Sequence, residues 1–135
     1  MGYTHYWDND GFTEKQWTLA RYRMRRIIAH SDVDVRSEYD DSRAPAITDS
    51  DIHFNGVGDD GHETFFVAKE GGSEFCKTAR KPYDEIVVAA LGMLSNLNPN
   101  FRWMSDGDPE DHVDGKLLCD KALGGSQWMD PEPSR

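Results

Sequence analysis

The sequence predicts an α+β fold, in which a mostly antiparallel sheet of about five strands carries helices packed on one face. Short stretches rich in β-forming residues alternate in polarity, which is typical of strands. Longer stretches repeat apolar residues at steps of three and four, which predicts helices. Turns rich in glycine and aspartate join the middle strands directly and therefore favour hairpins. The expected order along the chain is β-α-β-β-β-α-β-α.

The first strand and the first helix are predicted near the N-terminus. Residues 2–7, GYTHYW, are rich in β-forming residues and alternate in polarity. Thr13 and Gln16 have the spacing of a capping box, and Phe12 and Trp17 have that of a hydrophobic staple, so we expect a helix over 13–30. Its apolar face consists of Trp17, Ala20, Met24, Ile27 and Ile28.

The middle of the chain is predicted to hold a long loop and three strands. Residues 31–46 have weak periodicity and many turn-forming residues, so we expect a surface loop there. Residues 47–57 and 62–68 alternate like strands on either side of a Gly-Asp turn, which predicts a hairpin. A second glycine-rich turn leads into a strand at 74–79. Three successive strands of this kind predict a meander.

The last third of the chain is predicted to form a helix, a strand and a second helix. Pro82 precedes an apolar stripe over 83–97, which predicts a helix. Residues 101–105 favour a strand, and Asp108 is the expected N-cap of the final helix, which ends before Gly124. The apolar stripe of that helix is expected at Val113, Leu117, Cys119 and Ala122.

Length and charge narrow the class of protein. The 135 residues predict one α+β domain over 1–124 and a polar tail over 125–135 that frays. A formal net charge of −10 disfavours binding to a nucleic-acid duplex or to an anionic membrane. No apolar run approaches about 18 residues and no signal-peptide core is evident, so we expect a cytoplasmic location.

The densest chemistry lies at the predicted strand-to-helix junction over 75–84, FCKTARKPYD. Lys77, Arg80 and Lys81 precede a helix start, where unpaired backbone N–H groups and the helix dipole favour an anion. We therefore expect these cations to bind a phosphate or a carboxylate. The alternative is a solvated basic face, or ion pairs with Asp84 and the surrounding acidic residues.

Polar side chains also interrupt the predicted strands, and they have two explanations. They line one shared ligand pocket, or they make the ordinary hydrogen bonds of a folded protein. Tyr residues beside them offer flat surfaces on which a ring can stack. The predicted ligand-binding residues are His5, Tyr6, Asn55, His62, Glu63, Lys77, Thr78, Arg80, Lys81, Tyr83, Asp84, Ser105 and Asp106.

Catalytic and metal chemistry has weaker support in the sequence. Cys76 is a nucleophile only if a neighbouring cation lowers the pKa of its thiol, and a packed cysteine is the commoner case. The His62-Glu63 pair lacks the second histidine of a zinc-protease helix, because Phe66 occupies that position. His5, His53, His62 and Cys76 have no metal-site spacing. We therefore expect no metal and no cofactor, and we assign no catalytic residues.

Five segments of the chain form a specific combination: GYTHYW at 2–7, FNG at 54–56, HETF at 62–65, FCKTARKPYD at 75–84 and SDG at 105–107. Together they resemble a family of short, largely uncharacterised proteins of bacteria and their phages. The resemblance implies a bacterial cytosol, or a host cytosol if the protein is phage-encoded. It implies no catalytic residues, and by analogy it raises the expectation of a phage protein that captures a host defence signal.

Three functional hypotheses follow from these residues. The first is a non-enzymatic protein, in a homo-oligomer if a neighbour completes its pocket, that binds a small anionic, nucleotide-derived molecule. The second is a small hydrolase or transferase that uses His62 with Glu63 or Asp106 as acid and base, and Cys76 as nucleophile. The third is a protein-interaction module whose acidic surface mimics nucleic acid.

Overall fold

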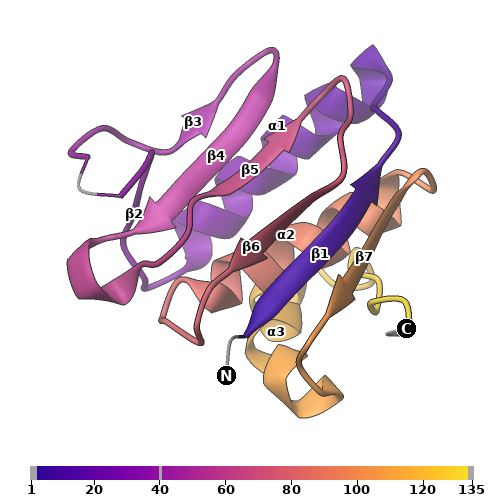
Figure 1. Ribbon diagram of the computed structural model, residues 1–135. Coiled ribbons are helices and arrows are strands. Elements are labelled where there is room, and N and C mark those ends of the chain that lie inside the picture. The colour runs from indigo at the N-terminus through magenta and orange to yellow at the C-terminus, as the bar shows by residue number, and fades with distance from the viewer. Residues whose placement is uncertain (1–2, 40, 134–135) are drawn as a thin grey trace.

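In the computed structural model, which describes residues 3–39 and 41–133, a layer of strands covers a layer of helices (Figure 1). The three α-helices all lie on the same side of the strands, which confirms the predicted α+β fold with helices on one face. Seven strands lie within the described residues, more than the sequence predicts, because two of them are only two residues long. No helix in the described ranges is long and apolar enough to span a bilayer.

The strand β1 (Thr4–Asn9) is the centre of a three-stranded antiparallel sheet. It pairs with β6 (Glu74–Lys77) on one side and with β7 (Phe101–Ser105) on the other. Because side chains alternate along a strand, His5 is fully buried beneath the sheet while Tyr6 lies on its open face. The sequence therefore builds one face for the core and one for solvent.

The second group of strands is organised around β4 (Asp51–Gly56). It pairs with β5 (Phe65–Ala68), as the predicted hairpin requires, and also with β2 (Val35–Arg36) and β3 (Ala46–Ile47). The predicted loop over 31–46 thus contributes two short strands. A 3₁₀ turn, η1 (Gly58–Asp60), follows β4.

The predicted strand over 47–57 is instead a small hairpin, because the chain turns at Thr48. The Thr48 hydroxyl accepts hydrogen bonds from the backbone N–H groups of Ser50 (3.2 Å) and Asp51 (3.0 Å). Such local side-chain bonds favour a turn over a continuous strand.

The predicted meander is also different, since β6 pairs with β1 rather than extending the hairpin. The strands β5 and β6 still run side by side (Figure 1). Glu63, just before β5, bridges them: its N–H donates to the Lys77 carbonyl at 3.2 Å, and its carboxylate accepts from the Lys77 N–H at 2.7 Å. A side-chain contact therefore joins the two groups of strands.

The helix α1 (Glu14–His30) begins as the sequence predicts. Thr13 and Gln16 form the reciprocal capping box, and the rings of Phe12 and Trp17 pack with centroids 5.1 Å apart. The helix α2 (Asp84–Leu97) is buried on all sides from Ile86 to Ser95, because it lies between the sheet and the other helices. It forms the centre of the hydrophobic core.

The final helix α3 (Val113–Leu123) buries Cys119 and Ala122 of its predicted stripe, but not the other two residues. It follows the 3₁₀ turn η2 (Pro109–His112) and ends at Gly124, whose φ of 85° is left-handed as expected of a C-cap. Val113 and Leu117, predicted to be buried, are 49% and 58% exposed. The helix instead turns small residues toward α2. A Cβ built on Gly115 would lie 2.4 Å from Val88, so glycine permits this close approach.

The tail segment is anchored rather than frayed over its described part. The Trp128 indole donates to the Val88 carbonyl at 3.0 Å, and the Met129 N–H donates to the Gly92 carbonyl at 3.0 Å. The Glu132 N–H donates to the Trp103 carbonyl of β7 at 2.7 Å. The prediction of a frayed tail followed from its polar composition and gave no weight to Trp128, the aromatic residue that fixes the segment. Residues 134 and 135, and Gly2 of the predicted first strand, lie outside the described residues.

Candidate functional site

Four of the predicted site residues meet in a buried polar network between β1, β7 and α2. His5 Nε2 donates to Asp84 Oδ1 at 2.7 Å, and the Thr78 hydroxyl donates to the same oxygen at 2.6 Å. His5 Nδ1 lies 2.9 Å from Ser105 Oγ. His112, which sequence reasoning missed, lies 3.0 Å from the same hydroxyl through its Nε2. Distant segments of the chain therefore converge here.

This network has the carboxylate–imidazole–hydroxyl order of a hydrolase triad, but its hydroxyl is enclosed. Ser105 Oγ is in contact with both histidines and accepts the Gly107 N–H at 2.9 Å. His5 is fully buried and Ser105 is 8% exposed. A nucleophilic hydroxyl must reach a substrate carbonyl, and this one points beneath the sheet. The network therefore ties the sheet to α2 and η2.

The three predicted cations do not converge on one cavity. Arg80 donates to Asp111 Oδ1 at 2.5 Å, and its guanidinium lies 4.1 Å from the centroid of the Tyr3 ring. This contact lowers the pKa of Asp111, as an adjacent cation should. Neither Lys77 nor Lys81 lines either of the two cavities described below.

The N-terminus of α2 is already occupied by carboxylates of the chain itself. Asp84 and Glu85 lie in its first turn, where negative charge is stabilised by the helix dipole. Asp84 accepts from His5 and Thr78, and Glu85 accepts from the Ser31 hydroxyl at 3.0 Å. These internal anions take the positions that the sequence suggested for a ligand.

Several other predicted site residues hold a turn and a strand in place. The Asn55 side chain bonds the backbone of Gly56 and His62, and also the Thr64 hydroxyl, so its polar atoms are satisfied. The Tyr83 hydroxyl donates to the Glu63 carbonyl at 2.5 Å. His62 itself is exposed beyond this turn. Its imidazole is therefore separate from the buried histidines.

Both cysteines of the chain are buried, and Cys76 is the one that the hydrolase or transferase hypothesis requires as a nucleophile. Burial raises the pKa of the Cys76 thiol to about 12, and the nearby Glu63 carboxylate adds to the shift, so the thiolate is scarce at neutral pH. Cys119 is likewise buried, with its pKa raised to about 12. Over the described ranges, no three His, Cys, Asp or Glu side chains are grouped closely enough to hold a metal ion.

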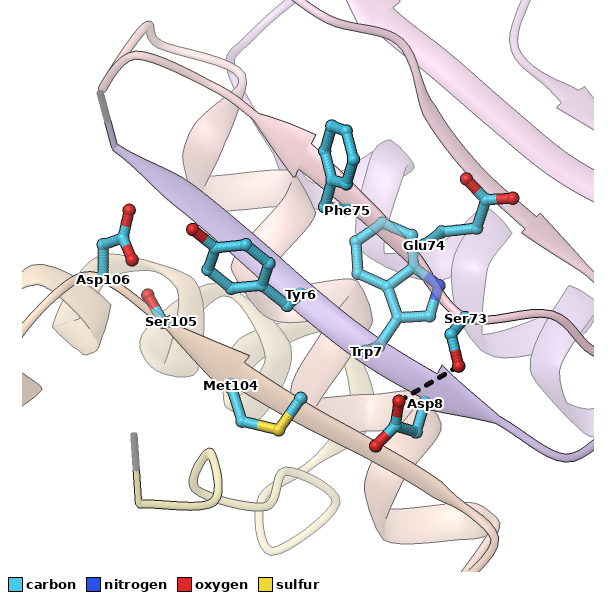
Figure 2. Close-up of a pocket in the computed structure, with 9 residues that line it drawn as sticks. All are labelled: Tyr6, Trp7, Asp8, Ser73, Glu74, Phe75, Met104, Ser105 and Asp106. Carbon is cyan, nitrogen blue, oxygen red and sulfur yellow. Dashed lines mark hydrogen bonds between the residues drawn. The ribbon is translucent and has the colours of Figure 1, made fainter. Parts of the chain in front are cut away.

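An open cleft lies on the face of the sheet that no helix covers, centred on Tyr6 (Figure 2). The pairing of β1 places Phe75 opposite Tyr6 on one side and Met104 opposite it on the other. Tyr6 is 40% exposed and Phe75 is 60% exposed, so the floor is aromatic and reachable. The volume is about 510 Å³, and the lining residues are Tyr6, Trp7, Asp8, Ser73, Glu74, Phe75, Met104, Ser105 and Asp106.

Carboxylates surround this aromatic floor. Figure 2 shows Asp106 at one end of the cleft and Asp8 and Glu74 at the other. The Ser73 hydroxyl orients Asp8 at 3.0 Å, and the Thr4 N–H donates to Asp106 at 3.2 Å. No cation is among the described lining residues. The cleft is therefore suited to a positively charged group, which aromatic faces and carboxylates both attract.

Sequence reasoning found only part of this cleft. Tyr6, Ser105 and Asp106 were predicted as ligand-binding, although Ser105 contributes its hydroxyl to the buried network. Glu74, Phe75 and Met104 were missed as site residues. The available signal was an apolar side chain at an outward-facing strand position, where a solvated face normally carries polar residues.

Comparison of the chain with protein-family models, with curated proteins and with solved structures gives no match.

Proposed function

We propose that the protein is an interaction module that binds a basic segment of a partner protein on the open face of its sheet. The observation that carries this proposal is the arrangement of Asp8, Glu74 and Asp106 around the exposed rings of Tyr6 and Phe75. An arginine or lysine side chain entering the cleft meets an aromatic face and a carboxylate together. This reading develops the hypothesis of an acidic interaction module.

Most of the binding free energy of the basic segment is expected from contacts that exclude water, and little from exposed ion pairs. A cation over an aromatic ring contributes about 0.5–1 kcal/mol at an exposed site and about 2 kcal/mol when water is excluded. An exposed ion pair contributes about 0–1 kcal/mol. Arginine fits better than lysine, because its planar guanidinium stacks on a ring and bonds two carboxylate oxygens.

The charge of the whole protein supports the same partner. A net charge of −10 attracts a basic segment from a distance and accelerates the encounter. Lys77 and Arg102 extend from the same face of the sheet, Lys77 opposite Thr4 and Arg102 opposite Asp8 in the strand register, and neither lines the cleft. A ligand whose positive charge is confined to the part inside the cleft avoids repulsion from these two cations.

The other two hypotheses stay predictions. Binding of a small anion at Lys77, Arg80 and Lys81 predicts that replacing all three by alanine abolishes capture of a nucleotide-derived ligand, including any host defence signal. Hydrolase or transferase chemistry predicts a changed product when the protein is incubated with a nucleotide panel. Each experiment has an outcome separate from that of the peptide titration below.

The test is a titration with an arginine–glycine peptide, monitored by isothermal calorimetry. We expect saturable binding that weakens as salt rises. Phe75→Ala should weaken it by about three- to tenfold, since it removes about 0.7–1.4 kcal/mol. Glu74→Gln should weaken it by up to about fivefold, since an exposed ion pair contributes about 0–1 kcal/mol. Tyr22→Ala is the control, because Tyr22 is 56% exposed on α1, away from the open face.

A glutamate–glycine peptide of equal length should not bind. Equal loss of affinity in Tyr22→Ala and Phe75→Ala would show that any exposed ring suffices, and the proposal would then be wrong.

A further inference from the structure

A second cavity, of about 560 Å³, lies between α1 and α3 in the helical layer. It is separate from the cleft, because the helices are on the opposite side of the sheet from the open face. Its lining residues are Leu19, Tyr22, Arg23, Arg26, Lys121, Ala122, Leu123, Gly124 and Gln127.

The charge of this cavity is opposite to that of the cleft. Arg23, Arg26 and Lys121 line it, and no described lining residue is acidic. Asp120 of α3 adjoins the lining residue Lys121 in the chain; its Oδ2 accepts from Lys116 at 3.0 Å, and its Oδ1 is buried with no hydrogen-bond partner among the described residues. Concentrating three cations is costly in a compact site unless counter-charge is supplied. Because the chain as a whole has a net charge of −10, a local cluster of cations is unexpected and indicates a binding site for an anion.

Two of the cations are oriented by the fold. Arg26 donates from Nε to the Ala122 carbonyl at 2.9 Å, which fixes its guanidinium at the C-terminal end of α3. Arg23 Nη1 is shielded from solvent and has no hydrogen-bond partner among the described residues. A buried donor without an acceptor destabilises the folded protein, because it has lost its hydrogen bonds to water. An anion in the cavity would supply an acceptor.

Beside the cations, α1 presents an exposed apolar surface. Tyr22 is 56% exposed and Leu19 is 39% exposed, and both line the cavity. A phenol ring next to a guanidinium pair is suited to a ligand with an anionic end and a flat organic end. The side chain of Gln127 adds both a donor and an acceptor.

We propose that this helical cavity binds an organic phosphate, with Arg23, Arg26 and Lys121 on the phosphate and Tyr22 on the organic part. Phosphate fits better than a single carboxylate, because it offers several acceptor oxygens to three cations at once. This site is independent of the proposed peptide cleft, since the two share no lining residue.

The test is calorimetric titration of the full chain with pyrophosphate, adenosine monophosphate and acetate, which carries a single carboxylate. Pyrophosphate and the nucleotide should bind saturably, and acetate at least tenfold more weakly, about 1.4 kcal/mol. Lys121→Gln and Arg23→Gln should each weaken phosphate binding by about tenfold or more. Arg25→Gln is the matched control, because Arg25 is an exposed arginine of α1 outside the cavity, and it should stay within about twofold. Tyr22→Leu should weaken binding of the nucleotide but not of pyrophosphate.

Lys121 is exposed, so Lys121→Gln should retain the fold. The test therefore stays decisive even if Arg23→Gln does not fold. Three results would overturn the proposal: no saturable binding of either phosphate, equal losses in Arg25→Gln and Lys121→Gln, or acetate binding as tight as that of pyrophosphate.

Discussion

His5 on β1 and Asp84 in the first turn of α2 are joined by a 2.7 Å contact between Nε2 and Oδ1. The imidazole is fully buried and the carboxylate side chain is 15% exposed, so water competes little for this hydrogen bond. The contact connects residues 79 positions apart and fixes the helix beneath the central strand.

We expect Asp84→Ala to destabilise the protein by about 2–4 kcal/mol, because it leaves a buried imidazole and the Thr78 hydroxyl without their acceptor. Urea denaturation measures the change. Asp49→Ala is the control: Asp49 pairs with Arg21 but is 95% exposed, so its loss should cost under about 1 kcal/mol. Similar losses in the two variants would show that the buried network adds no stability.

Stability should fall as the pH drops below about 6.5, because of His112. Burial lowers the pKa of His112 from its ordinary 6.5, and nearby His5 lowers it further, while Asp84, Asp111 and Asp130 act in the opposite direction. The unfolded chain therefore binds a proton that the folded chain does not. The stability is fully present above pH 6.5 and is lost toward the lowered pKa, by at most about 1.4 kcal/mol per pH unit.

Urea midpoints measured between about pH 5 and pH 7 test this, with His112→Gln as the comparison. In His112→Gln the urea midpoint should no longer fall as the pH decreases over this range. An unchanged slope would assign the pH dependence to another group.

Neither cysteine should react with a thiol reagent in the folded protein. Burial raises the pKa of Cys76 and of Cys119 to about 12, so at pH 8 almost no thiolate is present or accessible. Labelling with iodoacetamide should begin only when urea unfolds the chain. Ser73→Cys is the positive control, since Ser73 is exposed, and it should label at once. Rapid labelling of the unmodified protein would contradict the buried positions.

The tail should detach when Gly92 is replaced by alanine. A Cβ at Gly92 would lie 2.0 Å from Trp128 Nε1, so the indole must leave its contact with the Val88 carbonyl. We expect a loss of about 1–3 kcal/mol. Hydrogen exchange at the Met129 and Glu132 amides, both bonded to the body of the protein, should accelerate. Protection equal to that of the original chain would mean that the tail does not depend on this contact.

Local signals predicted much of the fold. The capping box of Thr13 and Gln16 lies within one turn of chain, and the structure forms it as expected. Strand pairing depends on distant residues, so the sequence did not indicate that β6 joins β1. The buried face of α3 was predicted in part: Cys119 and Ala122 are buried as expected, but apolar character favoured Leu117, whereas close packing favours the small Gly115.

The candidate site was less predictable from the sequence, because the acidic residues that pair with its cations are distant in the chain. The sequence shows Arg80 near a helix start, but not that Asp111 comes to meet it. It shows Tyr6 as a strand residue, but only the register places Phe75 and Met104 beside it. The cleft and the buried network are therefore both products of long-range pairing.

The most direct test of the peptide cleft is an NMR titration that follows the Met104 methyl and the Tyr6 ring as the arginine–glycine peptide is added. These two side chains face each other across β1 and β7 and both line the cleft. The proposal predicts saturating shifts at both, with Phe75→Ala needing about three- to tenfold more peptide to reach the same shifts. Shifts confined to the helical layer, or no shifts at all, would contradict it.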